Sequence, residues 1–163
     1  MRYQGFFHMS DKKTDRGGYE NSANIDENVM MSIVRTAELF KKKAGAVFKN
    51  RGLTFSQYNV LRILDASPDG KNTMTNISRI MLVSGANMTG IVKRLEKSGF
   101  LLKMGDASDD RITVVEITSK GRDALKDIHT EKEKNLKEYM NIVSTDKKEE
   151  ILGMLKQIHK ALR

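Results

Sequence analysis

One stretch of the sequence, Ser84 to Gly121, constrains the fold more than any other because it combines an amphipathic helix with a hairpin. Its first part, residues 85–97, places apolar side chains at positions i, i+3, i+4 and i+7, the spacing of a helix with one buried face. These side chains are Met88, Ile91, Val92 and Leu95. Ser84 can cap the helix at its N-terminus, and Ser98-Gly99 predicts its end.

The second part of the stretch predicts two strands, residues 100–104 and 112–117, joined by a polar loop. The loop carries one cation, Arg111, among three aspartates. A neighbouring carboxylate can orient an arginine toward a narrow minor groove, so Asp109 is a candidate partner of Arg111 or of Arg94. Taken alone, the loop is also compatible with an ordinary hairpin turn whose charges are simply exposed.

The outer face of the predicted helix carries small and polar side chains that suit a DNA major groove. Asn87 can pair with adenine, Lys93 or Arg94 with guanine or phosphate, and the methyl group of Thr89 with thymine. Gly90 would let the helix backbone approach the DNA closely. Other surface helices also carry Asn, Thr and Lys, so the helix alone does not establish DNA binding. The hairpin beside it strengthens that interpretation.

Two shorter helices are predicted before this one. Thr54-Phe55-Ser56-Gln57 has the form of a capping box and starts a helix that ends before Ser67-Pro68-Asp69-Gly70. Thr73 marks the start of the next helix, which ends shortly before Ser84. Short helices joined by a tight turn are typical of a helix-turn-helix. We therefore predict that residues 53–118 form a winged helix-turn-helix DNA-binding region.

Long amphipathic segments, residues 25–52 and 119–163, flank this region. Their apolar stripes offer more surface than residues 53–118 alone could cover, so we predict a helical dimerisation region that pairs two chains. Packing of the same helices within one chain is the alternative. Residues 1–24 are polar and are expected to form a flexible N-terminal arm.

The composition favours a mainly α fold with a small β-hairpin wing, since the chain has one proline and 39% hydrophobic residues. The absence of cysteine excludes disulfides and cysteine-ligated zinc. His8, His129 and His159 have no metal-ligand spacing, and no catalytic motif is present, so we expect no metal, no cofactor and no enzymatic activity.

The net charge of +8 favours a polyanionic partner. Residues 73–121 contain seven basic and five acidic side chains, so the charge is spread out and does not by itself identify a DNA-binding surface. The sequence has no apolar run of about 18 residues, which a membrane span needs. It also lacks the apolar segment of a signal peptide, and we expect a cytoplasmic protein.

The ordered motifs resemble the MarR family of winged-helix transcriptional regulators. They are Leu53-Thr54 with Gln57 and Leu61, Met88-Thr89, Arg94-Leu95-Glu96-Lys97, Gly99-Phe100, Asp109-Asp110-Arg111, and Ile117-Thr118 with Gly121. The resemblance implies a homodimer that presents two recognition helices and two wings. It assigns base contacts to Ser84, Asn87, Thr89, Gly90 and Lys93, the minor-groove contact to Arg111, and wing support to Asp109. Two departures are Lys103 and Asp110, where the family often has an arginine and a basic residue.

Together these features predict a sequence-specific transcriptional regulator, a repressor that binds a palindromic operator in double-stranded DNA as a homodimer. The resemblance adds a small-molecule effector, for which the sequence identifies no binding residues. Two alternatives remain open: an architectural DNA-binding protein without sequence specificity, and a winged-helix module that binds another protein.

Overall fold

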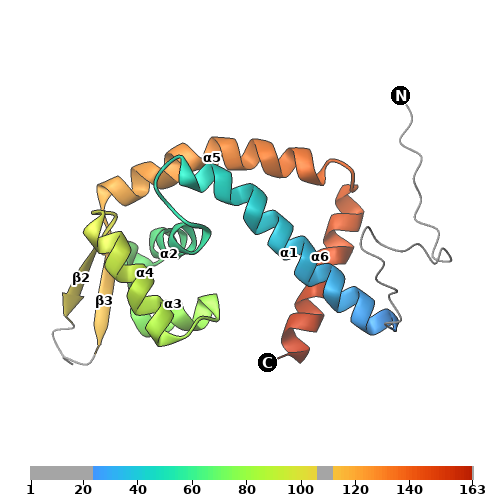
Figure 1. Ribbon diagram of the computed structural model, residues 1–163, viewed down its shortest axis with the longest axis horizontal. Coiled ribbons are helices and arrows are strands. Elements are labelled where there is room, and N and C mark those ends of the chain that lie inside the picture. Colours follow the sequence, from blue (N-terminus) through green and yellow to red (C-terminus); the bar gives the residue numbers. More distant parts are fainter. Residues whose placement is uncertain (1–23, 106–111, 163) are drawn as a thin grey trace, which may run out of the picture. The chain divides into compact units, whose positions relative to one another are not determined.

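The computed structural model describes residues 24–105 and 112–162 (Figure 1). Its helices are α1 (Ile25–Lys49), α2 (Phe55–Asp65), the 3-10 turn η1 (Pro68–Gly70), α3 (Met74–Met81), α4 (Gly85–Lys97), α5 (Ser119–Met140) and α6 (Thr145–Ala161). Its strands are β1 (Lys71–Thr73), β2 (Leu101–Gly105) and β3 (Thr113–Ile117). The order confirms a mainly helical winged helix-turn-helix.

The chain divides into two compact units, residues 1–40 and residues 41–163. The predicted N-terminal arm lies outside the described residues except for Asn24. In the first unit the structure describes the first part of α1, none of which is buried. The second unit contains the end of α1 and every other described element.

Side-chain caps set the helix starts where the sequence predicts them. The hydroxyl of Thr54 accepts from the Gln57 amide at 3.3 Å, while the Gln57 side chain accepts from the Thr54 amide at 2.8 Å. This reciprocal pair is the predicted capping box, and it satisfies two backbone donors that the first turn would otherwise leave unpaired. Thr73, Ser84 and Thr118 cap α3, α4 and α5 through the hydroxyl alone, which accepts from the backbone amide three residues further on.

The sheet has three antiparallel strands in the order β1-β3-β2. In the wing, β2 pairs with β3 so that Lys103 lies opposite Val115. Strand β1 pairs with the other edge of β3, and Lys71 there lies 3.6 Å from Glu116 in an ion pair. The hairpin prediction was therefore incomplete. Strand β1 has only three residues, the last of which, Thr73, is also the cap of α3, and this is too short to show the alternation that predicts a strand.

The hydrophobic core joins the inner face of α4 to α2, to the sheet and to the first turns of α5. Its fully buried side chains are Phe48, Val60, Leu61, Leu64, Ile77, Met88, Val92, Leu95, Leu101, Val115 and Ile128. The rings of Phe48 and Tyr58 stack with their centroids 4.3 Å apart, which fixes the end of α1 against α2. All the core-facing residues of α4 are buried, so the helix cannot rotate about its axis. Its opposite face therefore stays turned toward solvent.

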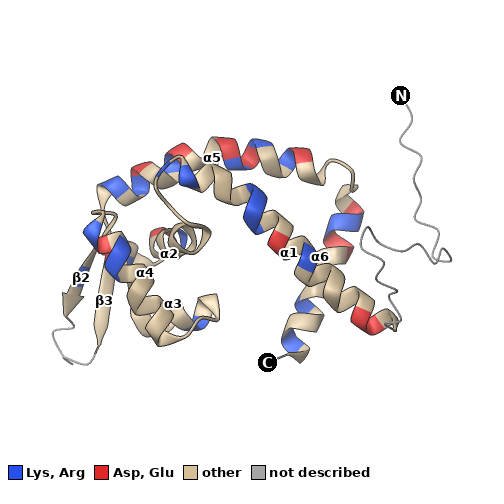
Figure 2. Ribbon diagram, viewed as in Figure 1, with Lys and Arg blue, Asp and Glu red and all other residues tan. Residues whose placement is uncertain are grey.

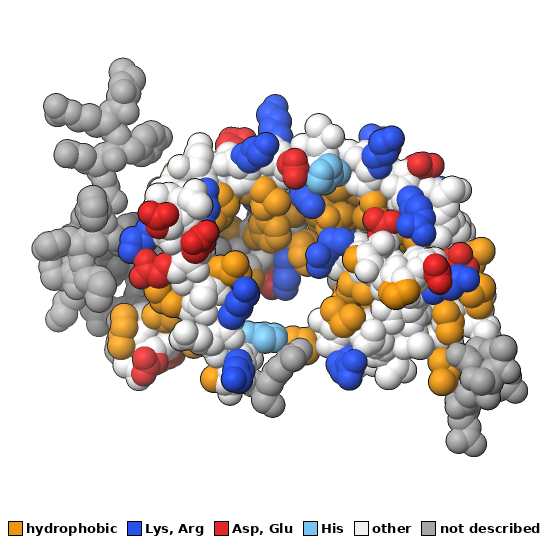
Figure 3. All heavy atoms as spheres, turned by 180° about the vertical axis from the view of Figure 1, so that it is seen from behind, with side chains coloured by type: hydrophobic (Ala, Val, Ile, Leu, Met, Phe, Trp, Pro, Cys, Tyr) orange, Lys and Arg blue, Asp and Glu red, His pale blue; other side chains and the backbone are white. Residues whose placement is uncertain are grey.

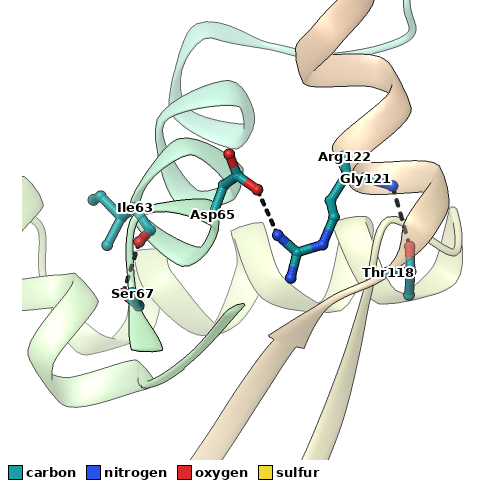
Figure 4. Close-up of polar contacts among 6 residues, drawn as sticks. All are labelled: Ile63, Asp65, Ser67, Thr118, Gly121 and Arg122. Atoms are coloured by element: carbon teal, nitrogen blue, oxygen red, sulfur yellow. Dashed lines mark hydrogen bonds and ion pairs between the residues drawn. The ribbon is translucent and has the colours of Figure 1, made fainter. Parts of the chain in front are cut away.

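The first turn of α5 ties the base of the wing to α2 (Figure 4). The Thr118 hydroxyl donates to the Gly99 carbonyl oxygen at 2.8 Å and accepts from the Gly121 amide at 3.2 Å. One residue further, the Arg122 guanidinium reaches Asp65 at the end of α2, at 2.6 Å. A side chain at Gly121 would collide with the Phe100 carbonyl oxygen, so only glycine lets the helix lie this close to β2.

The terminal helices keep much of their apolar surface exposed. Helix α6 has no buried residue, although Ile151, Leu152, Met154 and Leu155 recur along it. The end of α5 likewise exposes Tyr139 and Met140. Among the described helices, none is long and apolar enough to cross a membrane.

Candidate nucleic-acid interface

Helices α3 and α4 form a helix-turn-helix closed by a side-chain hydrogen bond. Leu82 ends α3 in the left-handed conformation, with φ 53° and ψ 42°, and this reverses the chain within three residues. The Ser78 hydroxyl then donates to the Val83 carbonyl oxygen at 2.6 Å, and the Val83 amide donates back to the Ser78 carbonyl oxygen at 3.1 Å. The pair fixes the angle at which α4 leaves the turn.

The outer face of α4 consists of the side chains opposite its buried stripe. We define it by Ala86, Asn87, Thr89, Gly90, Lys93, Arg94 and Lys97, of which all but the half-buried Gly90 are exposed. Because the inner residues Met88, Ile91, Val92 and Leu95 are buried as predicted, the outer face is presented by a rigid element.

Each recognition-helix residue singled out in the sequence lies on this face or at its start. Ser84 is the N-cap, and its hydroxyl accepts from the Asn87 amide at 3.4 Å. The Thr89 hydroxyl donates to the Gly85 carbonyl oxygen at 3.0 Å, so its hydrogen is already used within the helix. The Asn87 side chain is exposed and has no hydrogen-bond partner among the described residues.

Gly90 lies in the middle of α4, where glycine is unfavourable for a helix. A Cβ atom at this position would meet only the Arg94 guanidinium, at 3.8 and 3.9 Å. The fold therefore does not require glycine here, in contrast to Gly121. A residue that costs helix stability without a packing reason is expected where another molecule approaches the backbone closely.

The cations of the outer face are not neutralised by the fold. Lys93, Arg94 and Lys97 form no ion pair with any residue in the described ranges. Elsewhere, Arg51 pairs with Asp127 at 3.4 Å and Arg122 pairs with Asp65. Figure 2 shows basic positions toward the end of α4 with an acidic position among them, and both signs also alternate along α5.

Acidic residues are also absent from the first turns of the helices that form the helix-turn-helix. Helices α3 and α4 have none there, and neither do α2 and α5, whereas α1 begins with Asp26 and Glu27 and α6 has Asp146. A helix N-terminus carries a partial positive charge, and an acidic residue would cancel it. The N-termini of α3 and α4 therefore keep a potential that favours an anion.

The tip of the wing lies outside the described residues. This applies to Arg111, to Asp109 and to Asp110, so the minor-groove contact and its carboxylate support remain predictions. The described base of the wing is well anchored, because the Lys120 ammonium donates to the Ser98 carbonyl oxygen at 2.7 Å and lies 4.9 Å from the centroid of the Phe100 ring. Lys103 is exposed on β2.

One feature of the helix-turn-helix was not predicted. A cleft of about 420 Å³ lies between α3, α4 and the start of β3, and it is lined by Met74, Thr75, Ser78, Gly85, Met88, Thr89 and Thr113. From β1 into α3, Asn72, Asn76 and Arg79 form a chain of side-chain hydrogen bonds. Their spacing of four and three residues, running from β1 into α3, is the sequence signal that could have revealed the contact.

Residues 53–113 match the family model of the MarR family. Over these residues the chain is similar to the MarR family. It is 30% identical over 105 residues to the HTH-type transcriptional regulator TtmR of Methylorubrum extorquens, which covers 64% of this chain and 53% of TtmR. The chain thus spans about half the length of that relative.

Solved structures of MarR-family regulators from Streptomyces coelicolor share the fold. Sco5413 has a TM-score of 0.75 and 26% identity, and the match covers 86% of this chain and 96% of Sco5413. Sco3205, solved in complex with DNA, has a TM-score of 0.78 and 18% identity, and covers 84% of this chain and 87% of its own. The likeness of this chain to Sco3205 concerns the fold alone.

Proposed function

We propose that this protein is a transcriptional regulator that binds double-stranded DNA sequence-specifically through α4. The observation that carries the proposal is the outer face of α4, which combines a mid-helix glycine, unpaired cations and the exposed Asn87 side chain. Phosphate contacts would supply most of the affinity, and contacts from α4 to base edges would supply the choice of sequence.

The residues of α4 take separate roles in this proposal. Asn87 pairs with an adenine, Lys93 and Arg94 contact guanine or phosphate, and Gly90 admits a close approach of the backbone. Ser84 and Thr89 lie at the same end of the helix, with hydroxyls engaged in capping and in a bond to the preceding turn. Ser84 would therefore contact DNA by donating its free hydroxyl hydrogen, whereas Thr89 would do so through the remaining acceptor capacity of its oxygen or through its methyl group.

The wing adds a minor-groove contact from Arg111, which Asp109 orients. The base of the wing is held by hydrogen bonds from Thr118 and Lys120 to the end of the α4 segment, at Gly99 and Ser98. Arg111→Ala should weaken DNA binding strongly without changing the oligomeric state. Unchanged affinity in a gel-shift titration would remove Arg111 from the interface.

We further propose that two copies of the chain form a homodimer through the terminal helices. The support is the apolar surface that α1 and α6 each expose, including Val29 and Val34 on the first and Leu152 and Leu155 on the second. Isolated apolar side chains are common on surfaces, but rows of them along a helix are typical of an interface. In the space-filling view of Figure 3, apolar side chains are also exposed at the surface, among scattered charged side chains of both signs.

A two-fold dimer would present two copies of α4 to DNA. The two helices would then lie in successive major grooves, about 34 Å apart, and the operator would be a palindrome. In this arrangement the protein acts as a repressor by occupying its operator, and a small-molecule effector releases it.

The decisive experiment is selection of bound sequences from a random pool of DNA duplexes. The proposal expects an enriched palindrome whose half-sites lie one helical turn apart. Asn87→Ala should weaken binding to that duplex strongly and binding to a scrambled duplex little. The ratio of the two affinities should therefore fall. Binding to random DNA within tenfold of the best selected site would indicate an architectural protein, and no measurable DNA binding at physiological salt would indicate a protein-interaction module.

A further inference from the structure

We propose that Arg79 on α3 binds a phosphate of the DNA strand beside the groove that α4 enters, and that Asn76 and Asn72 hold it in place. The inference rests on the proposed DNA binding and deepens it, because it assigns a backbone contact to a helix other than α4. It starts from a chain of hydrogen bonds that links the end of α2 to the exposed surface of α3.

The first links of the chain run from α2 to β1. The Ser67 hydroxyl donates to the Ile63 carbonyl oxygen at 2.7 Å (Figure 4), so its oxygen can only accept from a further partner. The Asn72 side-chain amide supplies that partner and donates to the Ser67 oxygen at 2.8 Å. The amide nitrogen of Asn72 is therefore turned toward Ser67, and its carbonyl oxygen is turned away.

The next links carry this orientation into α3. The Asn72 side-chain oxygen accepts from the backbone amide of Thr73 at 2.8 Å and from the side-chain nitrogen of Asn76 at 2.9 Å. With its nitrogen used in this way, Asn76 presents its oxygen outward. That oxygen accepts from the Arg79 guanidinium at 2.8 Å. Each amide orientation is thus set by the previous link rather than by the arginine.

The Arg79 side chain is consequently held in a defined position, but its positive charge is not neutralised. Its only hydrogen-bond partner among the described residues is a neutral amide, and it forms no ion pair within those ranges. A guanidinium has five N–H donors, so most of them remain available. An exposed arginine that gives up side-chain entropy to a scaffold while keeping its charge and donors is suited to bind an anion.

The position of Arg79 indicates which anion. Thr75, one turn before Arg79 on the same side of α3, lines the cleft shared with Gly85 and Thr89 of α4. Arg79 is exposed on this same helix, the first of the helix-turn-helix. Such a helix crosses the DNA backbone when the second helix enters the major groove. The guanidinium would then meet a phosphate of the flanking strand.

The experiment measures the affinity of the full chain for the selected palindromic duplex and for a scrambled duplex, across a range of salt concentrations. Arg79→Ala removes one phosphate contact per subunit, so the slope of log affinity against log salt should fall by about 0.9 per contact, or roughly 1.8 per dimer. At about 0.15 M salt this corresponds to roughly a 30-fold loss of affinity. The loss should be equal on both duplexes, because phosphates carry no sequence information.

Arg51→Ala is the matched control, since it removes the same charge from an exposed arginine that is already paired with Asp127. It should leave the salt slope unchanged. An unchanged slope in Arg79→Ala would overturn the phosphate contact, and a loss confined to the selected duplex would overturn it in favour of a base contact. If the unmodified protein binds neither duplex, the proposed function itself fails.

The positioning role of Asn76 has its own test, a double-mutant cycle. Asn76→Ala should weaken DNA binding when Arg79 is present and have no further effect in the Arg79→Ala background. The melting temperature of each variant reports any purely structural effect. Equal losses from Asn76→Ala in both backgrounds would show that Asn76 supports the fold and does not orient the arginine.

Discussion

Replacing Gly90 by alanine should make the protein more stable and a weaker DNA binder. Gly90 is in the interior of α4, and a Cβ there would meet only the Arg94 guanidinium at 3.8 Å, an ordinary van der Waals distance. The gain in helix propensity from glycine to alanine is about 1 kcal/mol. For a domain of this size that corresponds to a rise of roughly 2–4 °C in melting temperature.

The same methyl group would project from the face that is proposed to contact DNA. An extra methyl in a closely packed contact costs about 1–3 kcal/mol, which is roughly a 5- to 150-fold loss of affinity. Thermal unfolding measures the first effect, and a fluorescence-anisotropy titration with the selected duplex measures the second. The two effects have opposite signs, so a weakened variant could not be explained by partial unfolding.

Gly153→Ala is the control for this experiment. Gly153 lies in the interior of α6, and a Cβ there has no neighbouring atom within 4 Å among the described residues. It should raise the melting temperature similarly and leave DNA affinity unchanged. If Gly90→Ala binds DNA as well as the unmodified protein, the backbone of α4 does not approach DNA at this point, and the main argument for the glycine is refuted.

Three further substitutions test the fold and the dimer. Gly121→Ala should lower the free energy of unfolding by about 1–3 kcal/mol, because its Cβ would collide with the Phe100 carbonyl oxygen; a chemical-denaturation curve matching the unmodified protein would contradict this. Leu82→Asn should raise the melting temperature slightly, by relieving about 1 kcal/mol of left-handed strain at a side chain that is 70% exposed; a lower melting temperature would refute it. Leu155→Glu should convert a dimer to monomers in sedimentation experiments, whereas Gln157→Glu should not, and identical sedimentation of the two would argue against α6 as the interface.

The sequence predicted those parts of the fold that depend on neighbouring residues. The capping residues Thr54, Thr73 and Ser84 were identifiable because a cap acts on an amide three residues away. The buried face of α4 followed from its period, and the glycine at 99 marked its end. These features are local, and a single sequence carries them in full.

Features that depend on distant contacts could not be predicted in the same way. Strand β1 exists because β3, more than 40 residues later, pairs with it at Asn72 and Val115. The requirement for glycine at 121 arises from the Phe100 carbonyl oxygen, which no pattern around residue 121 reveals. The orientation of Arg79 depends in turn on β1, since Asn72 is the link between Ser67 and Asn76. Because the sequence did not predict the three-residue strand β1, it did not reveal Arg79 as a candidate DNA contact.

The pairing of cations distinguishes those that support the fold from those proposed to contact DNA. Arg122 and Lys71 form ion pairs with Asp65 and Glu116, and both pairs join separate elements of the winged helix. Arg79, Lys93 and Arg94 have no acidic partner among the described residues. Exposed unpaired cations contribute little to folding, so their removal should change DNA affinity and its salt dependence while the melting temperature stays nearly constant. Removing Arg122 should instead lower the melting temperature, since it leaves Asp65 without its partner across the junction of α2 and α5.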